Sequence, residues 1–203
     1  MYLPKVRELK EAVTAIFKGP YTHPFPKEPT PVPETLRAAP KYNSEFCIGC
    51  GACAEVCPAR AIKVEDILYE GKPVRRLTCN YGNCIFCGEC QLNCTTEKGI
   101  RLSQEYELSF FEADDAREII EHELVLCDVC GKVIAPKGQL RHLYRKLGAI
   151  AYSNPTLYLT RTGEIALTDG ISQRDERPIG RWDIMRVTCP ECRRNILLKE
   201  EWG

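Results

Sequence analysis

The chain is organised around two cysteine runs, CIGCGACAEVCP at residues 47–58 and CIFCGECQLNCT at residues 84–95. Each has the spacing C-x2-C-x2-C-x3-C, with which proteins hold [4Fe–4S] clusters. Three closely spaced thiolates wrap one cluster, whereas the distal cysteine reaches across to the other. The spacing predicts cluster A on Cys47, Cys50, Cys53 and Cys94, and cluster B on Cys84, Cys87, Cys90 and Cys57. Structural cysteines, disulfides or zinc knuckles are the alternative, which two full copies of one motif disfavour.

The two runs are also an internal repeat, since residues 47–57 align without gaps to residues 84–94. Repeat halves related by a pseudo-twofold axis suit a cross-ligated pair of clusters. We therefore expect an α+β chain with a bacterial 2[4Fe–4S] ferredoxin-like core at residues 42–110. One departure is Thr95, which stands where Pro58 stands in the first run. Proline fixes the turn, so we interpret Thr95 as tuning the loop of cluster A rather than as loss of a ligand.

Composition favours a reducing compartment, hence the cytoplasm. Its 13 cysteines occur in metal-type pairs and quartets rather than at spaced disulfide positions. We expect no signal peptide at its start and no membrane span, because no run approaches 18 apolar residues. The 28 basic and 28 acidic residues balance to a formal net charge of zero. This balance argues against a general nucleic-acid binder and suits a chain held inside a complex.

Residues 1–41 form the first predicted region. Residues 1–19 have the apolar spacing of an amphipathic helix, which Gly19-Pro20 ends. Residues 20–40 carry seven prolines and predict an extended strap, largely polyproline II. The apolar face of the helix packs either on protein or at a membrane interface, and the polar face is not strongly basic. His23 in the strap is expected to be a surface contact.

Short strands are expected within the cluster domain at residues 61–64, 74–77 and 99–102, with residues 70–73 forming a turn. Cys79 is the one unpaired thiol, and we expect it to be buried as a small apolar residue. We also expect Ile48, Ile85 and Phe86 to keep water from the clusters. Residues 111–123 are predicted to be a helix, because acidic residues at 112, 114 and 115 would complement its dipole.

Residues 111–203 are predicted to be a C-terminal zinc-ribbon or rubredoxin-like lobe. Two C-x2-C knuckles with an adjacent Gly or Pro indicate one tetrahedral thiolate site, with ligands Cys127, Cys130, Cys189 and Cys192. Zinc is the favoured ion and a single iron the alternative. His122 and His142 are considered as substitute ligands and disfavoured, since four cysteines fill the site. Between the knuckles we expect a helix at 139–147 and a hairpin of residues 157–160 with 165–168.

CIFCGECQLNC at 84–94, IRLSQEYELS at 100–109 and TCPEC at 188–192 together resemble the iron–sulfur subunit of formate hydrogenlyase and related hydrogenase-4-type complexes. The cluster domain is also similar to the two-cluster subunit of respiratory complex I, but the four-cysteine tail fits the hydrogenlyase branch better. The resemblance implies a peripheral subunit on the cytoplasmic side of the cell membrane, within a membrane-bound complex. Implied partners are [NiFe] hydrogenase small and large subunits, membrane-arm subunits and an iron–sulfur donor subunit of formate dehydrogenase or another dehydrogenase.

We therefore expect an electron-transfer subunit of an oxidoreductase complex, with no catalytic site of its own, because no phosphate loop or catalytic triad order is present. The equivalent subunit of a quinone- or ferredoxin-linked complex I-like enzyme is the alternative. A nucleic-acid-binding zinc ribbon, hinted at by Arg193 and Arg194, is disfavoured by the neutral charge. Glu89 is a candidate for tuning cluster B, since a nearby carboxylate disfavours an added electron.

Overall fold

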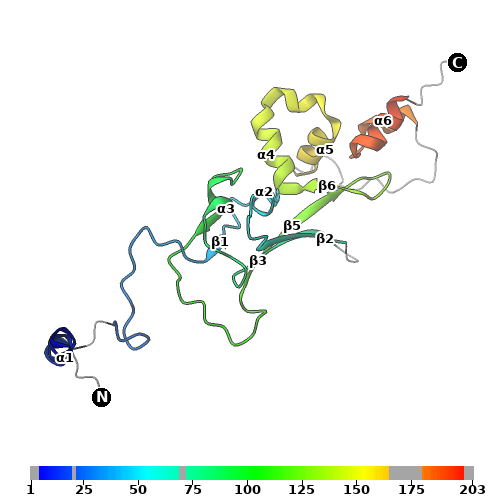
Figure 1. The fold of residues 1–203 in the computed structure, drawn as a ribbon. Helices are drawn as coiled ribbons and strands as arrows, with labels where there is room; N and C mark the ends of the chain where they lie inside the picture. The colour runs from blue at the N-terminus through cyan, green and yellow to red at the C-terminus, as the bar shows by residue number, and fades with distance from the viewer. Residues whose placement is uncertain (1–4, 20–21, 69–71, 165–179, 199–203) are drawn as a thin grey trace. The chain divides into compact units, whose positions relative to one another are not determined.

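The structure is a computed structural model that describes residues 5–19, 22–68, 72–164 and 180–198. It divides into two compact units, residues 1–36 and residues 37–203, and each is described by itself. Figure 1 shows the ribbon of both units.

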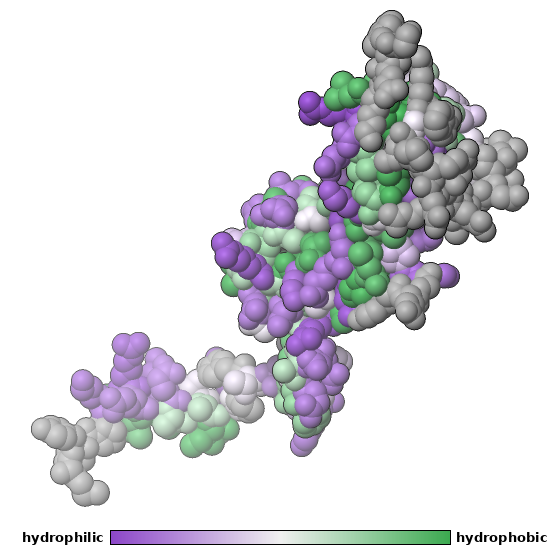
Figure 2. Space-filling view, turned by 90° about the vertical axis from the view of Figure 1, so that its right-hand side faces the viewer, coloured by the Kyte–Doolittle hydropathy of each residue, from purple (hydrophilic) through white to green (hydrophobic). Residues whose placement is uncertain are grey.

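The first unit contains helix α1, Val6–Lys18, as the apolar spacing predicted. Lys5 directly precedes the helix, and its backbone N–H donates to the carboxylate of Glu8 at 3.0 Å. No residue of α1 is buried, and both hydrophilic and hydrophobic side chains are exposed along this segment in Figure 2. The exposed apolar side chains are Val6, Leu9, Val13, Ile16 and Phe17. Residues 22–36 of the strap contain no helix or strand, and the extended, largely polyproline II conformation stays a prediction.

None of the helices in the described ranges combines the length and the apolar character that crossing a membrane requires.

Two antiparallel sheets organise the second unit (Figure 1). The smaller sheet pairs β1, Pro40–Tyr42, with β4, Ile100–Leu102. The larger sheet has the order β2-β3-β5-β6, with bounds Ile62–Leu68, Pro73–Asn80, Arg117–Leu126 and Val133–Pro136. The three strands predicted in the cluster domain are confirmed, two of them longer than expected. Residues 70 and 71 of the predicted turn at 70–73 lie outside the described residues.

The predicted helix at 111–123 is wrong, because residues 117–126 form the strand β5. Burial alternates along β5, with Glu118, Ile120, His122 and Leu124 facing inward, which is the period of a strand. Residues 117–123 pair with the whole of Val74–Asn80 in β3. An acidic first turn is only a local preference, and here the long-range ladder with β3 outweighs it.

The C-terminal part of this unit is helical. It contains α4, Lys137–Leu147, and α5, Pro155–Glu164, followed by α6, Pro190–Leu198, with 3-10 turns η1 at Gly148–Ser153 and η2 at Arg181–Met185. Helix α4 confirms the helix predicted at 139–147 and starts two residues earlier.

The hairpin predicted over 157–168 is wrong for its first strand, because residues 157–160 lie in α5. Asn154 caps this helix: its side-chain oxygen accepts the N–H groups of Thr156 at 3.0 Å and Leu157 at 3.4 Å. Pro155 takes the first helical position, where its missing N–H costs nothing. The Asn-Pro start signal outweighs the strand propensity of the residues that follow. The second predicted strand, 165–168, lies outside the described residues.

The core of the ferredoxin-like part lies between the two sheets and the cysteine loops. Its fully buried members include Ala39, Leu77, Cys79 and Ile100. Cys79 is 0% exposed, so the prediction that this thiol is buried is confirmed. The same core contacts Cys53, Cys90 and Cys94 of the two motifs, which ties the cysteine loops to the sheets.

Candidate cluster and metal sites

The first cysteine loop turns sharply at two glycines. Gly49 and Gly51 have φ of 69° and 82°, in the left-handed region that favours glycine. Gly51 precedes the short helix α2, Ala52–Glu55. This loop lines a cavity together with residues that follow the second run. The cysteines in its wall are Cys47, Cys50, Cys53 and Cys94.

The second loop repeats this backbone. Gly88 has φ of 86° and precedes the short helix α3, Glu89–Leu92. Phe86, which aligns with Gly49, also has a positive φ, 52°. This loop lines a second cavity, and the cysteines in its wall are Cys57, Cys79, Cys84, Cys87 and Cys90. Each cavity therefore combines three cysteines of one run with the distal cysteine of the other, and Cys79 adds a fifth thiol to the second.

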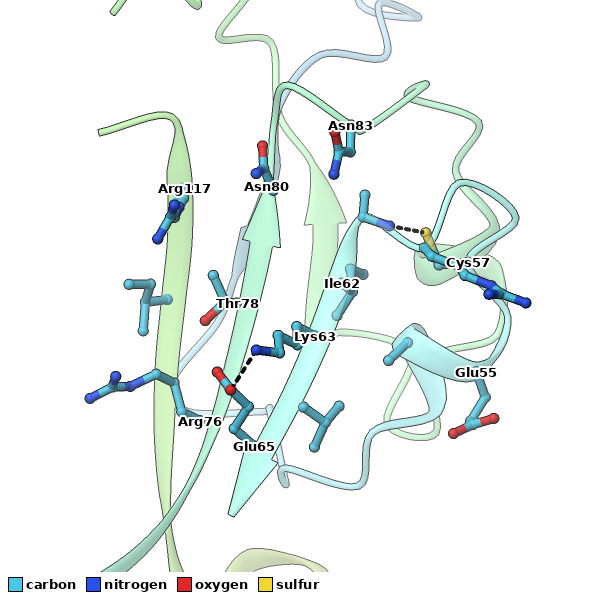
Figure 3. Close-up of a pocket in the computed structure, with 15 residues that line it drawn as sticks. Glu55, Cys57, Ile62, Lys63, Glu65, Arg76, Thr78, Asn80, Asn83 and Arg117 are labelled. Carbon is cyan, nitrogen blue, oxygen red and sulfur yellow. Dashed lines mark hydrogen bonds and ion pairs between the residues drawn. The ribbon is translucent and has the colours of Figure 1, made fainter. Parts of the chain in front are cut away.

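Donors from the chain already point at several of these sulfurs. The Phe86 N–H donates to Cys84 Sγ at 3.4 Å, and the Ala61 N–H donates to Cys57 Sγ at 3.3 Å, a contact drawn in Figure 3. The Thr95 hydroxyl lies 3.4 Å from Cys50 Sγ. Such donors stabilise negative charge on sulfur, and they are one means by which proteins set the potential of a cluster.

Tyr42 supplies a test of whether the first cavity suits an inorganic cluster. Its hydroxyl is buried and has no hydrogen-bond partner among the described residues, yet its side chain lines the cavity of Cys47 and Cys53. Burial raises the pKa of Tyr42, and the Cys53 thiol adds to this, so the phenol keeps its proton. A buried hydroxyl without a partner is costly. A cluster sulfur in this cavity would accept its O–H, so the residues fit the group.

His122 does not join the four-cysteine site for which it was considered. Its Nε2 lies 3.2 Å from Cys47 Sγ, on the first cluster loop. The ring is half-buried, and burial lowers the pKa of His122, with Arg75 adding to the shift. His142 is likewise absent from the four-cysteine group.

The sequence interpretation missed Tyr42, and it placed His122 in a predicted helix instead of on the strand β5. The repeat held a signal for Tyr42, which stands five residues before Cys47 just as Cys79 stands five before Cys84. No local signal pointed to His122, because 75 residues separate it from Cys47.

A groove on the outer face of the larger sheet borders the second cavity (Figure 3). Many of its lining side chains are polar or charged, and they come from β2, β3 and β5, from α2 and from neighbouring loops. Several of its charges are paired within the chain: Lys63 with Glu65 at 2.6 Å and Arg76 with Glu121 at 2.7 Å. Cys57 lies at its edge, so this groove leads toward one cysteine of the second cavity.

The apolar cover over the second loop is thinner than the sequence predicted. Ile85 is 62% exposed and Leu92 is 76% exposed. The expectation that Ile85 keeps water out is therefore wrong for this chain by itself. Ile48 and Phe86 are half-buried, as a covering side chain requires.

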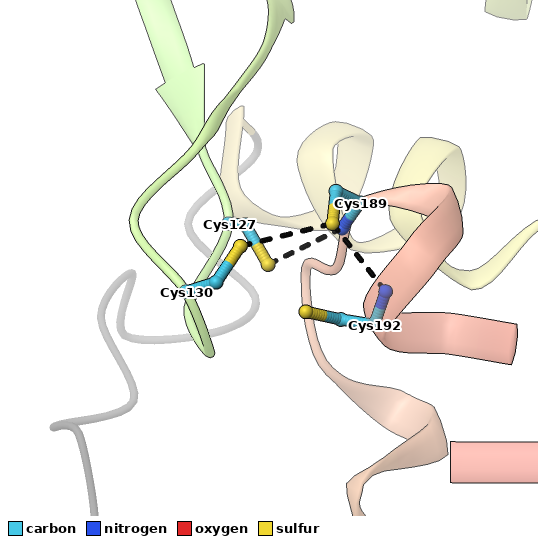
Figure 4. A group of neighbouring side chains, drawn as sticks. All are labelled: Cys127, Cys130, Cys189 and Cys192. Carbon is cyan, nitrogen blue, oxygen red and sulfur yellow. Dashed lines mark hydrogen bonds between the residues drawn. The ribbon is translucent and has the colours of Figure 1, made fainter. Parts of the chain in front are cut away.

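The four cysteines of the C-terminal part meet in one group, shown in Figure 4. Cys127 and Cys130 lie on the turn between β5 and β6, whereas Cys189 directly precedes α6 and Cys192 lies within it. Their sulfurs all lie within 4.8 Å of one another. Cys130 is exposed and the other three are buried. The spacing of the sulfurs suits one tetrahedral thiolate site, and the ribbon-like or rubredoxin-like detail stays a prediction.

Two hydrogen bonds between Asp128 and Val187 hold the two knuckles together across 59 residues. Asp128 N–H donates to the Val187 carbonyl at 2.9 Å, and Val187 N–H donates to the Asp128 carboxylate at 3.0 Å. Burial opposes ionisation of Cys127, but N–H donors led by that of Cys189 outweigh it and lower the pKa of Cys127 to about 7. A thiol so placed is ready to ligate a metal as the thiolate.

Arg193 is engaged inside this lobe. Its guanidinium donates to the hydroxyls of Thr156 at 2.6 Å and Thr188 at 3.0 Å. These contacts join α5 to the second knuckle, which gives Arg193 a structural role.

Comparison with known proteins identifies relatives for much of the chain. Residues 46–98 match the family described as 4Fe-4S dicluster domain. Formate hydrogenlyase subunit 6 of Escherichia coli K12 is 38% identical over 122 residues, which are 60% of this chain and 66% of that protein. NADH-quinone oxidoreductase subunit I 2 of Geobacter metallireducens is 32% identical over 121 residues, 57% of this chain and 92% of that protein.

Among solved structures, the membrane-bound sulfane sulfur reductase, described as an archaeal respiratory membrane complex, has a similar chain. The identity is 26% and the TM-score 0.39, covering 57% of this chain and 61% of that one. This chain thus spans less than two thirds of that structure and of formate hydrogenlyase subunit 6. It covers 92% of the Geobacter protein at 32% identity. The chain belongs to the family of two-cluster iron–sulfur subunits that includes NADH-quinone oxidoreductase subunit I and formate hydrogenlyase subunit 6.

Proposed function

We propose that this chain is an electron-transfer subunit that relays electrons through two [4Fe–4S] clusters to the small subunit of a membrane-associated [NiFe] hydrogenase of the formate hydrogenlyase type. The observation that carries the proposal is the pair of cavities, each lined by three cysteines of one run and the distal cysteine of the other. The clusters supply one-electron redox chemistry when bound. The chain holds them, sets their surroundings and has no bond-making step of its own.

The ligand sets follow the walls of the cavities. Cluster A takes Cys47, Cys50, Cys53 and Cys94, and cluster B takes Cys57, Cys84, Cys87 and Cys90. Cys79 lines the second cavity but is not needed to complete four ligands. Its burial raises its pKa, which keeps it a neutral thiol beside the cluster rather than a competing thiolate ligand.

The four-cysteine group holds one Zn2+, or a single iron as in rubredoxin. The compact group of sulfurs supports a closed site with no open coordination position, which is typical of a structural ion. Its place between the end of β5 and the start of α6 means that the ion joins the sheet to the last helix. Residues 111–203 thereby form a metal-stabilised lobe beside the cluster domain of residues 42–110, with residues 1–41 as a separate helix and strap.

The subunit works on the cytoplasmic side of the cell membrane, within a complex that also contains the hydrogenase large subunit and membrane-arm subunits. An iron–sulfur subunit of formate dehydrogenase or another dehydrogenase supplies the electrons. The 38% identity to formate hydrogenlyase subunit 6 supports this branch. The 92% coverage of a NADH-quinone oxidoreductase subunit supports the alternative, an equivalent subunit in a quinone- or ferredoxin-linked complex I-like enzyme.

The test is hydrogen evolution from reduced viologen by the complex purified anaerobically, through this chain, from its own solubilised membranes. Hydrogen release, with [NiFe] subunits in the preparation, is the expected result. Viologen oxidation coupled only to quinone, without hydrogen, would move the chain to the complex I-like branch. A preparation in which this chain carries no iron and acid-labile sulfide would overturn both branches.

A further inference from the structure

The contact between His122 and Cys47 links the two metal-binding parts of the chain. His122 lies on β5, opposite Arg75 in the ladder with β3. Its Nε2 is 3.2 Å from Cys47 Sγ. A cysteine that ligates iron is a thiolate and offers only lone pairs. The imidazole must then donate its Nε2–H to that sulfur.

The equivalent position in the second half of the repeat shows that the first half makes room for this ring. Gly49 and Phe86 align, and both have a positive φ, 69° and 52°. The loop therefore accepts a large side chain in the second half. At Gly49, however, a β-carbon would stand 2.9 Å from ring carbons of His122. The space taken by His122, and not the backbone conformation alone, requires glycine at 49.

The first loop also meets the lobe that carries the four cysteines. Gly138 at the start of α4 packs so closely that a β-carbon there would lie 3.3 Å from Ile48 Cα. Arg75 Nη1 donates to the Gly49 carbonyl at 3.4 Å and also pairs with Asp66. The strand that presents His122 continues directly to Cys127 of the first knuckle. The first cysteine loop therefore contacts both β5, through His122, and the start of α4, through Gly138.

Cys84 is the cysteine that matches Cys47 in the second half of the repeat, and the side chain near its sulfur is a weaker hydrogen-bond donor. Cys84 accepts the N–H of Phe86 at 3.4 Å, and the buried thiol of Cys79 lines the same cavity. A thiol is a weak donor, whereas an imidazole N–H is a strong one. The two first cysteines of the repeat therefore differ in the side chain that faces their sulfur.

We propose that His122 makes the reduction potentials of the two clusters differ. It donates a hydrogen bond to Cys47 Sγ, which raises the reduction potential of cluster A and leaves that of cluster B unchanged. The proposal rests on the function proposed above, in which Cys47 ligates cluster A. Reduction adds one electron and one negative charge to a cluster and makes or breaks no covalent bond in the chain. A donor to a ligating sulfur stabilises that added charge. His122 acts through its hydrogen bond to the ligating sulfur of Cys47, and it is not itself a ligand of the cluster.

The experiment is a potentiometric titration, followed by electron paramagnetic resonance, of the anaerobic complex that contains the full chain, with dithionite as reductant. The signals are assigned with Cys53→Ala and Cys90→Ala, which should remove cluster A and cluster B respectively. In His122→Phe the midpoint of cluster A should fall by about 59 mV, the equivalent of a tenfold change in its reduced-to-oxidised ratio. Cluster B should not move.

Three further variants separate a hydrogen bond from a general structural effect. His122→Gln keeps an N–H donor and should restore much of the midpoint of cluster A. Gly49→Ala keeps the imidazole but displaces it, and should lower the same midpoint. His142→Phe makes the same substitution on α4, at a residue that lines neither cavity, and should change neither cluster.

The proposal is overturned if the midpoint of cluster A stays in place in His122→Phe, or if both clusters shift alike. If His122→Phe assembles no cluster A, Gly49→Ala decides, and an unmoved midpoint there overturns it. Failure of the proposed function would give a different result. The wild-type chain would then contain fewer than the about 8 iron atoms that two clusters require, or would lack the two electron paramagnetic resonance signals. With both signals present, only the role of His122 is at stake.

Discussion

Cys47 and Cys84 occupy equivalent places in the two halves of the repeat, yet they meet different parts of the molecule. The imidazole of His122 lies against Cys47, and the lobe that carries it packs on the same loop. The loop of Cys84 leaves Ile85 and Leu92 exposed. The repeat thus reproduces the ligand geometry, and elements outside the repeat supply the differences. Two cavities built alike need not hold their clusters at the same potential.

The largest expected effect concerns the lobe that packs on the loop of Cys47. In Cys189→Ser we expect loss of the four-cysteine ion and cooperative unfolding of this lobe, because such an ion contributes about 10–16 kcal/mol to folding. The midpoint of cluster A should shift toward its value in His122→Phe, and cluster B serves as the internal control. Metal analysis and redox titration on one preparation measure both. An ion-free lobe with an unchanged cluster A would break the proposed link.

Tyr42 provides a second difference between the halves, because Cys79 stands at the equivalent position. In Tyr42→Phe the midpoint of cluster A should fall by the equivalent of a roughly fivefold change in its reduced-to-oxidised ratio, since one hydrogen bond is worth about 1 kcal/mol. Potentiometric titration of the purified complex measures the shift.

A different result is expected if the Tyr42 hydroxyl does not donate a hydrogen bond to a cluster. If its hydroxyl meets no cluster sulfur, Tyr42→Phe removes a buried group without a partner. The chain would then gain thermal stability while both midpoints stay where they are. Cys79→Ala is the matched change in the second half, and it should leave cluster A unaffected.

The smallest expected effect is at Glu89, in the second cysteine run. Its carboxylate is exposed and accepts a hydrogen bond from Asn93 Nδ2 at 3.1 Å. In Glu89→Gln the midpoint of cluster B should rise by the equivalent of about a twofold change in its reduced-to-oxidised ratio, because solvent screens exposed charges. Glu97→Gln is a control at another exposed glutamate. A rise in cluster A instead of cluster B would contradict the assignment of the two cavities.

The sequence was informative wherever spacing alone determines structure. The two cysteine runs predicted which residues line each cavity, and the C-x2-C pairs predicted the group of Cys127, Cys130, Cys189 and Cys192. The strands that follow each run were also predictable, because they repeat with the motifs. In each of these cases the relevant residues are close in sequence or are marked by an unmistakable spacing.

Prediction failed where long-range pairing or a local capping signal decided the outcome. Residues 111–123 carry acids suited to a helix start, but β3 offers a complete ladder partner and a strand forms. At 157–160 the apolar and β-branched residues suggested a strand, whereas Asn154 and Pro155 start a helix. The error at β5 also hid the placement of His122, because only a strand paired with β3 brings its ring to Cys47.

The exchange of the distal cysteines is the central claim, and Cys94→Ala tests it most directly. Cys94 belongs to the second run by sequence but lines the cavity of the first. Electron paramagnetic resonance of the dithionite-reduced complex should show loss of the signal that Cys53→Ala also removes, while the signal removed by Cys90→Ala remains. Loss of the latter signal instead would mean that each run ligates its own cluster, and would contradict the account.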